Sequence, residues 1–272
     1  MNKIEAYEVA RAAQLAFILE PIPEKPGLTT RSKDMCEEVK LENFLIGGVN
    51  IGEAFRELAT RLNEAKDSKT TLLPLTYDLC YKAQKDSLRG RTGCRLNYGG
   101  IITLFPIIIT QCRLNTIDSI EILNGIGETL RMTSTLDTVW LQKMRNLAYE
   151  VTGYKRKDIF EISEDYDNIF DYYKKGLDNI KSVNKATNPY GHDCHTGRTN
   201  VELTTGYPYL KKMLILFESI SKQNPSLTYT KRMEKLDQSM RMFYPHEAPV
   251  WFADLYTCLT YLLIIKDEDS LK

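Results

Sequence analysis

The sequence predicts an all-α protein with a single multi-helix domain spanning residues 1–272. Apolar side chains recur at steps of three and four residues towards both ends of the chain, which is the spacing of one helix face. Alternating strand patterns are few, and neither a repeat of fixed period nor a low-complexity linker divides the chain. We therefore expect about eight to eleven helices packed around one core.

The first two helices are expected over residues 2–19 and 34–63. An alanine-rich stripe that ends at Phe17 gives the first of them a face suited to close helix packing. Gly47 and Gly48 interrupt the second, and each costs up to ~1 kcal/mol relative to alanine. Two explanations of this glycine pair remain open: a close crossing of two helices, or close approach of a ligand to the backbone.

The segment 101–110 is ambiguous. Its β-branched, apolar residues favour a strand locally, whereas Pro106 argues against a central strand. Periodicity alone does not decide between strand and helix for so short an apolar run. The remaining helices are expected over residues 70–84, 116–130, 135–150, 164–181, 201–222, 225–243 and 248–266.

The composition excludes several classes of partner. Lys plus Arg equals Asp plus Glu at 36 each, so there is no overall attraction to nucleic acid or to an anionic membrane. The longest apolar runs are well short of the roughly 20 residues that a spanning helix needs. The six cysteines are scattered without a CxxC pair, and the charged start has no signal peptide pattern. We expect free thiols, a cytoplasmic location, and no nucleic-acid or membrane partner.

Residues 20–35, EPIPEKPGLTTRSKDM, form the most unusual stretch of the chain. Three prolines hold it extended, and Gly27 allows close approach of a ligand to the backbone. Lys25 and Arg31 offer positive charge, while Glu20 and Asp34 bracket the segment and could hold a divalent cation. This combination suits a polyphosphate with Mg²⁺. The alternative is a proline-stiffened surface loop without a ligand.

Two further polar loops carry candidate binding residues. The loop 85–100 is basic and glycine-rich, and it leads into a helix start that would attract phosphate through free amides. Its candidates are Arg95, Asn97 and Gly100. The loop 182–200 contains His192, Cys194 and His195 as possible zinc ligands, but they lack the usual paired spacing of such ligands, which favours a solvated loop without a metal.

These motifs together resemble the triphosphoribosyl-dephospho-CoA synthase family. The family's early signature is a Glu, then a few residues later Pro-Lys-Pro-Gly-Leu-Val and an Arg or Asp. Glu20, residues 25–28 and Arg31 match it, whereas Thr29 stands in place of the Val. The family's Asn-Thr-His or Asn-Thr-Asn triplet before a glycine-started helix is replaced by Leu96, Asn97 and Tyr98. Near the end, Ala-Asp-Leu is kept around Asp254, but the preceding Asn-Pro-Gly-Thr is lost. The resemblance covers residues 15–60, 93–180 and 205–265.

The resemblance implies an all-helical fold, with residues 101–110 in a helix. It also implies a transferase that joins ATP to 3′-dephospho-CoA and releases adenine, with Mg²⁺ as cofactor. The implied catalytic carboxylates are Glu20, Asp34 and Asp254, of which Glu20 and Asp34 would also hold the metal. The implied nucleotide-binding residues are Lys25, Pro26, Gly27, Arg31, Arg95, Asn97 and Gly100. As a surface-loop residue, Lys25 should be replaceable by alanine without harm to the fold.

Other functions remain open at this point. The acceptor could differ from dephospho-CoA, and the chain could form a homodimer. The lost polar motifs also fit a relative that has lost catalysis and binds a nucleotide or a protein. A metal-dependent hydrolase is a third reading, but it would need Glu-x-x-His or His-Asp pairs on facing helices, which the sequence lacks.

Overall fold

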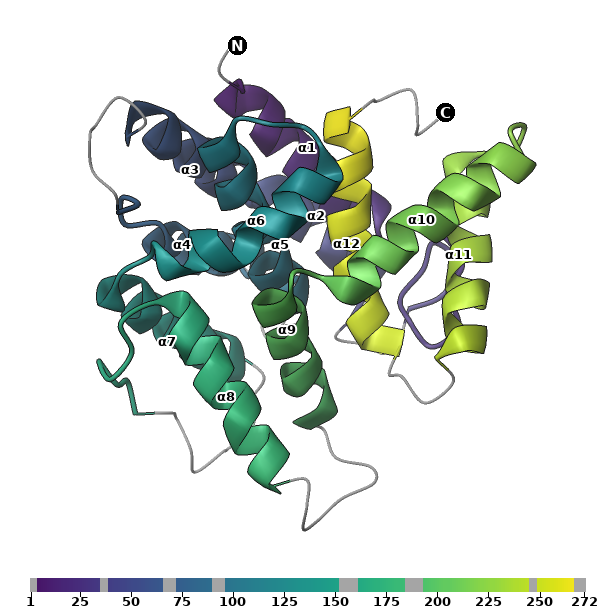
Figure 1. Ribbon diagram of the computed structural model, residues 1–272. Coiled ribbons are helices and arrows are strands. Elements are labelled where there is room, and N and C mark those ends of the chain that lie inside the picture. The colour runs from purple at the N-terminus through teal and green to yellow at the C-terminus, as the bar shows by residue number, and fades with distance from the viewer. Residues whose placement is uncertain are drawn as a thin grey trace.

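The computed structural model describes residues 4–34, 39–65, 72–89, 96–151, 161–183, 193–244 and 249–266 (Figure 1). The described residues contain helices and connecting loops but no strand, apart from an isolated bridge between Thr30 and Lys33. The prediction of an all-α fold is therefore confirmed. The helices are α1 (Ala6–Leu19), α2 (Leu41–Asn50), α3 (Gly52–Ala65), α4 (Tyr77–Ser87), α5 (Tyr98–Leu114), α6 (Ser119–Arg131), α7 (Thr135–Glu150), α8 (Ile169–Val183), α9 (Asp193–Thr205), α10 (Pro208–Gln223), α11 (Tyr229–Phe243) and α12 (Pro249–Lys266).

The described residues form twelve helices, one more than the upper end of the predicted range. The expected helix over 34–63 is broken at Ile51, just after the glycine pair, into α2 and α3. The expected helix over 201–222 is broken by Gly206 and Tyr207, which have φ values of 75° and 58°. A helix cannot continue through left-handed residues, and Pro208 then starts α10 at a position where its missing N–H costs nothing.

Helices α5 and α12 form the centre of the core. Residues 101–110 lie within α5, which confirms the helix that the family resemblance implied. Every residue of α5 from Gly100 to Cys112 is buried. Pro106 removes one backbone hydrogen bond within α5, and the Thr110 hydroxyl donates to the Pro106 carbonyl at 2.8 Å. Helix α12 packs against α1, α5 and α10, so both ends of the chain contribute to one core (Figure 1).

Asp137 is a structural residue in this fold. Its carboxylate is fully buried and accepts hydrogen bonds from the backbone N–H groups of Thr76, Tyr77 and Ser134. It thereby completes the capping box of α7 and also satisfies free donors at the start of α4. Through these contacts Asp137 joins α4 to α7.

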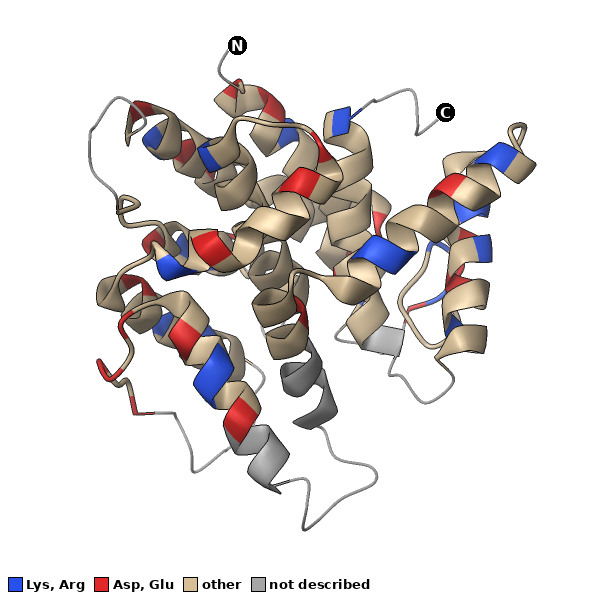
Figure 2. Cartoon of the chain, in the orientation of Figure 1, with Lys and Arg blue, Asp and Glu red and all other residues tan. Residues whose placement is uncertain are grey.

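None of the described helices is by itself long and apolar enough to cross a membrane; α5 and α6 meet the requirement only together, and that pair is bent by 100°. Cys80, Cys112 and Cys258 are buried and are not joined by disulfide bonds. Positive and negative side chains are interspersed over the helices, as the balanced composition led us to expect (Figure 2).

Glu202 on α9 joins α9 to α10 by hydrogen bonds across the break at Gly206 and Tyr207. It is fully buried, and its carboxylate accepts hydrogen bonds from the backbone N–H groups of Tyr209 at 3.0 Å and Leu210 at 3.3 Å. Burial raises the pKa of Glu202 from 4.5 to about 7, and the hydrogen bonds from Tyr209 and Leu210 only partly oppose this. The ionised form of Glu202 is therefore less stable in the folded protein than in the unfolded chain.

We predict that Glu202 makes the protein lose stability as the pH rises from about 4.5 through about 7. Glu202→Gln keeps an oxygen acceptor but cannot titrate. When the pH is raised from 5 to 8, the free energy of unfolding of wild type should therefore fall by up to about 3 kcal/mol more than that of Glu202→Gln. Urea unfolding at both pH values measures this difference. Glu218→Gln, an exposed change in α10, is the control and should follow wild type. Parallel pH profiles for wild type and Glu202→Gln would contradict the prediction.

Candidate functional site

The candidate site lies where the end of α1 meets α2, the start of α5, and α12. Glycines allow this close approach: a methyl group on Gly48 would lie 3.1 Å from Phe17 Cβ, and one on Gly100 would lie 2.7 Å from Phe17 Cε1. A methyl group on Gly47 would lie 2.5 Å from Asn97 Nδ2. The glycine pair of α2 is thus explained at least by close helix packing.

A buried ion pair stands at the centre of the site. Glu20 directly follows α1, and its Oε1 lies 3.1 Å from Lys25 Nζ. The Lys25 ammonium also donates to the Glu20 carbonyl and lies 5.8 Å from the centre of the Tyr256 ring. The two residues are only 7% and 2% exposed. The expectation that Lys25 is a surface-loop residue is therefore wrong, because the prolines turn the loop inwards at this point.

The electrostatics of Glu20 reflect a surplus of negative charge. Burial raises the pKa of Glu20 above its usual value; the Lys25 ammonium opposes this rise, while the charges of Asp254 and Asp237 add to it. Three carboxylates, at the end of α1 and on α11 and α12, therefore act on one small region that contains two described cations, Lys25 and Arg241. Such a region favours a ligand or transition state with positive charge.

Asp254 on α12 lies directly against the first turn of α5. A methyl group added to Gly99 would overlap the Asp254 carboxylate, so a bare backbone is needed at Gly99. Helix starts favour anions, and here the anion is a side chain of the protein. The predicted phosphate site at this helix start is thus faced by a carboxylate, which would repel a phosphate and attract a cationic group.

Asn97 forms the turn into α5. It adopts a left-handed conformation with φ 59°, and it is 8% exposed. Within the described part of the chain its Nδ2 has no hydrogen-bond partner, although buried donors are normally satisfied. The amide lies beside Gly47 at the wall of the site. A ligand carbonyl or hydroxyl oxygen that reached this wall would satisfy it.

The outer half of the 20–35 loop is organised by Glu24. The Glu24 carboxylate accepts hydrogen bonds from Ser32 at 2.7 Å, Thr30 at 2.9 Å and Arg31 at 3.2 Å. The bond from Ser32 contributes most to lowering the pKa of Glu24, and those from Thr30 and Arg31 add to it. Arg31 is about half exposed at 49% and also pairs with Glu234 of α11 at 3.8 Å. Arg31 therefore lies on the accessible rim of the site.

The predicted residues separate into an inner and an outer group. Glu20, Lys25, Asn97, Gly100 and Asp254 come together at the end of α1 and the start of α5.

The outer group consists of the exposed residues Pro26, Gly27, Arg31 and Asp34. The Asp34 carboxylate accepts a hydrogen bond from the Leu41 N–H at the start of α2. Arg95, His192 and His246 lie outside the described residues, as do the side chains of Cys194 and His195, so the possible zinc ligands are untested.

The fit of the site to Mg²⁺ depends on how the ion would be held. The described residues contain no group of three His, Cys, Asp or Glu side chains placed to hold a metal. Magnesium ions that accompany nucleotides commonly bind through one or two carboxylates plus phosphate oxygens. The exposed carboxylate of Asp34 fits that mode, whereas that of Glu20 is already engaged by Lys25.

Two residues of α11 belong to the site but were missed from the sequence. Asp237 is fully buried, receives a hydrogen bond from the Tyr256 hydroxyl at 3.0 Å, and pairs with Arg241 at 2.6 Å. The i, i+4 spacing of Asp237 and Arg241 is visible in the sequence. Pairs with this spacing are commonly exposed and weak, so the spacing alone does not point to a site.

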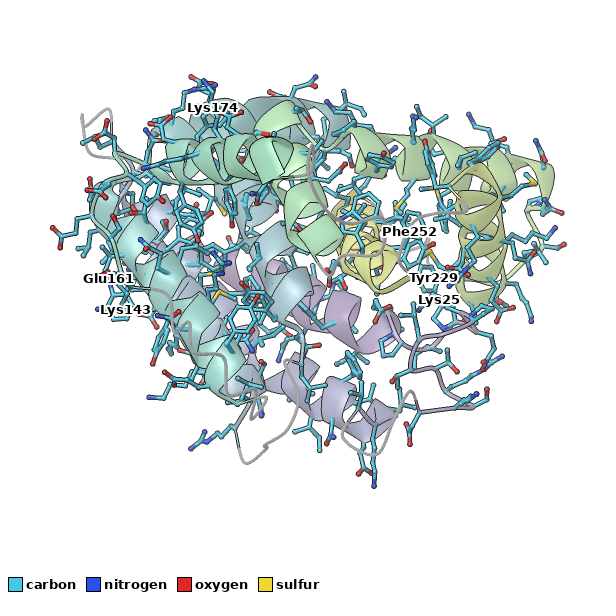
Figure 3. All side chains as sticks on the ribbon, turned by 90° about the horizontal axis from the view of Figure 1, so that it is seen from below. Lys25, Lys143, Glu161, Lys174, Tyr229 and Phe252 are labelled. Atoms are coloured by element: carbon cyan, nitrogen blue, oxygen red, sulfur yellow. The ribbon has the colours of Figure 1, made fainter. Side chains whose placement is uncertain are left out.

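A separate groove of about 380 Å³ lies on the far side of the helical body from the site. It is lined by Tyr81 of α4, several residues of α7 including Trp140 and Lys143, and Ile162. Figure 3 shows Lys143 and Glu161 on one side of the molecule, and Lys25, Tyr229 and Phe252 together on the other. The groove is therefore not part of the carboxylate site.

Comparison with known proteins supplies one match. The family model described as ATP:dephospho-CoA triphosphoribosyl transferase matches residues 6–188. This chain belongs to that family. No curated protein and no solved structure matches the chain. The family match contains Glu20, Lys25, Asn97 and Gly100, while Asp254 lies beyond its end.

We predict that the Glu20–Lys25 pair is important for stability. Lys25→Met leaves the Glu20 carboxylate buried without its cation, so it should destabilise the protein by about 3–5 kcal/mol at pH 8. The loss should be smaller at pH 5, because without Lys25 the pKa of Glu20 rises further and the carboxyl takes up a proton. Urea unfolding at the two pH values measures both effects.

The control for this prediction is the exposed pair of Lys82 and Glu57, whose Nζ–Oε2 distance is 2.7 Å. Lys82→Met should cost no more than about 1 kcal/mol. The double variant Glu20→Gln/Lys25→Met should recover much of the stability lost in Lys25→Met. A Lys25→Met protein as stable as Lys82→Met at pH 8 would rule out the buried pair.

We also predict that the start of α5 does not tolerate a side chain at Gly100. In Gly100→Ala the new methyl group would meet the Phe17 ring at 2.7 Å, and Phe17 is itself buried, so the change should cost about 1–3 kcal/mol. Gly127→Ala in α6 is the matched control, because its nearest contact would be the mobile end of Arg131 at 3.4 Å. That control should be neutral or slightly stabilising. Chemical denaturation compares the two, and equal effects would contradict the packing argument.

Proposed function

We propose that this protein transfers the triphosphoribosyl group of ATP to a hydroxyl group of a dephospho-CoA-like acceptor, with release of adenine. Family membership supports the class of reaction. The observation that carries the proposal is that Glu20 and Asp254, from opposite ends of the chain, act on one region at the start of α5. Because the two residues lie near opposite ends of the sequence, it is the tertiary fold that brings their carboxylates together.

The chemistry asks for negative charge near the sugar. The acceptor oxygen forms a bond to C1′ of the ATP ribose, the bond from C1′ to the adenine nitrogen breaks, and the hydroxyl proton finally resides on adenine. The transition state has oxocarbenium character, so a nearby carboxylate stabilises it. We assign this role to Asp254, which is partly accessible beside Gly99.

Glu20 is suited to proton transfer. Burial raises the pKa of Glu20, which brings it nearer to neutral pH, where a carboxyl group can both accept and donate a proton. Its present bond to Lys25 places the Lys25 ammonium beside any substrate that reaches Glu20. We therefore propose that Lys25 stabilises the ionised form of Glu20. Lys25 would contact a phosphate only if the Glu20–Lys25 pair separated.

The triphosphate is assigned to the rim of the loop. Arg31 is half exposed, and Gly27 has a φ of 79° and no side chain to obstruct a phosphate. A triphosphate carries about four negative charges and needs cations and a metal around it. Arg31 would release its ion pair with Glu24 and bind a phosphate instead. Asp34 would bind a magnesium ion that arrives with the nucleotide. The buried amide of Asn97 would bind an oxygen of the sugar or acceptor.

We predict that Asp254→Asn keeps nucleotide affinity within about threefold of wild type and lowers the rate of adenine release by at least about 100-fold. Asparagine has nearly the same shape but no charge, so binding survives while transition-state stabilisation is lost. Calorimetry with Mg·ATP measures binding, and chromatography of adenine after incubation with ATP and dephospho-CoA measures turnover. Glu53→Gln, at an exposed pair on α3, is the control.

The outcomes separate the two functions left open by the sequence. Adenine release by wild type that is lost in Asp254→Asn supports the transferase. Binding of Mg·ATP without adenine release, with any acceptor tested, favours a relative that has lost catalysis. Unchanged adenine release in a folded Asp254→Asn protein would overturn the role assigned to Asp254. Glu20→Gln is less informative, because it also leaves the buried Lys25 unpaired.

A further inference from the structure

One face of α11 contacts the 20–35 loop through Glu234 and Arg241, and Asp237 lies between these two residues on the same face. Glu234, Asp237 and Arg241 follow one another at steps of three and four, which places them on a single helix face. Glu234 accepts a hydrogen bond from the Glu24 N–H at 3.3 Å. Arg241 donates from Nη2 to the Pro26 carbonyl at 2.8 Å. This face of α11 thus contacts the loop immediately before and after Lys25.

Arg241 is held in place by a buried carboxylate. Its Nε donates to Asp237 Oδ2 at 2.6 Å, while the other oxygen of Asp237 accepts from the Tyr256 hydroxyl at 3.0 Å. The guanidinium has donors in a fixed planar arrangement, so one group can bind Asp237 and the Pro26 carbonyl together. A lysine at this position could keep the ion pair but could not make both bonds with that geometry.

Asp237 also acts on Glu20 through its charge and on Lys25 through Tyr256. Tyr256, which Asp237 fixes, lies under the Lys25 ammonium at 5.8 Å from ring centre to Nζ. Figure 3 shows Lys25 beside Tyr229 of α11 and near Phe252 of α12. Among the described residues, Glu20 interacts with Lys25 and with four further titratable groups: Tyr229 and Asp237 of α11, and Asp254 and Tyr256 of α12.

We propose that Asp237 and Arg241 are positioning residues, which hold the Pro26 carbonyl and thereby fix Lys25 and Glu20 at the carboxylate site. The consequence for catalysis rests on the proposed function, whereas the effect on the loop does not. Neither residue lies in the part of the chain that matches the family, which ends at residue 188. Helix α11 therefore holds a loop that lies about two hundred residues earlier in the sequence.

The test compares Arg241→Lys with wild type and with Lys235→Gln. Lys235 is an exposed residue of α11 that contacts Asn224 and not the loop, so it is the matched control. Hydrogen exchange of the loop is followed through the Leu28 and Thr30 amides, which donate to the Lys25 and Lys33 carbonyls. Loss of the bond to Pro26 should speed exchange of residues 21–34 by about tenfold. The free energy of unfolding in urea should fall by no more than about 1.4 kcal/mol, which corresponds to the same tenfold change.

A larger fall in the free energy of unfolding, with exchange in α6 faster by more than tenfold, would indicate a general loss of stability and would overturn the positioning role. Loop exchange in Arg241→Lys equal to that in Lys235→Gln would also overturn it. Asp237→Asn provides a second readout, because the lost charge should lower the pKa of Glu20, measured by NMR of the carboxyl carbons. An unchanged pKa of Glu20 in a folded Asp237→Asn protein would count against the assignment.

Activity provides the last arm and separates the two proposals. If wild type releases adenine, Arg241→Lys should lower kcat by at least about tenfold while Lys235→Gln leaves it unchanged. If wild type releases no adenine, the proposed function fails, and loop exchange with the pKa of Glu20 still decides whether α11 positions the loop.

Discussion

The buried ion pair of Glu20 and Lys25 is the interaction on which the site depends. An ion pair removed from water is stable only when its geometry is good and further hydrogen bonds satisfy the remaining polar atoms. Lys25 meets this condition through the Glu20 carboxylate, the Glu20 carbonyl and the Tyr256 ring. Because these partners come from the end of α1 and from α12, the pair joins the two ends of the chain.

The surroundings of the pair explain why it is charged at all. Burying a charge in an apolar core costs free energy, so charged residues are expected there only where polar partners surround them. The α5 start, Asp254 and Asp237 add polar groups and negative charge to one side of the pair, while the rest of α5 and α12 is packed against apolar side chains. The result is a polar region with rigid walls, which is the arrangement that electrostatic stabilisation of a transition state requires.

The sequence predicted the fold class and most helices because apolar periodicity records which face is buried. It did not reveal the break at Ile51 or the left-handed pair Gly206–Tyr207, because local conformation there depends on packing between helices. For the site, the motif predicted Glu20 and Lys25, and the remnant Ala-Asp-Leu predicted Asp254. Burial of Lys25 and the roles of Asp237 and Arg241 depend on contacts across the fold, which local patterns do not contain.

The positions of the two tryptophans have a spectroscopic consequence. Trp251 is fully buried, packs edge-on against Tyr209, and lies three residues before Asp254. Trp140 is on the opposite side of the molecule, in the separate groove beneath Lys143. The chain has only these two indoles, so their fluorescence divides between a site reporter and a distant reference. Replacing Trp140 with phenylalanine would leave Trp251 as the single tryptophan, and its emission would report on the start of α12 without any added label.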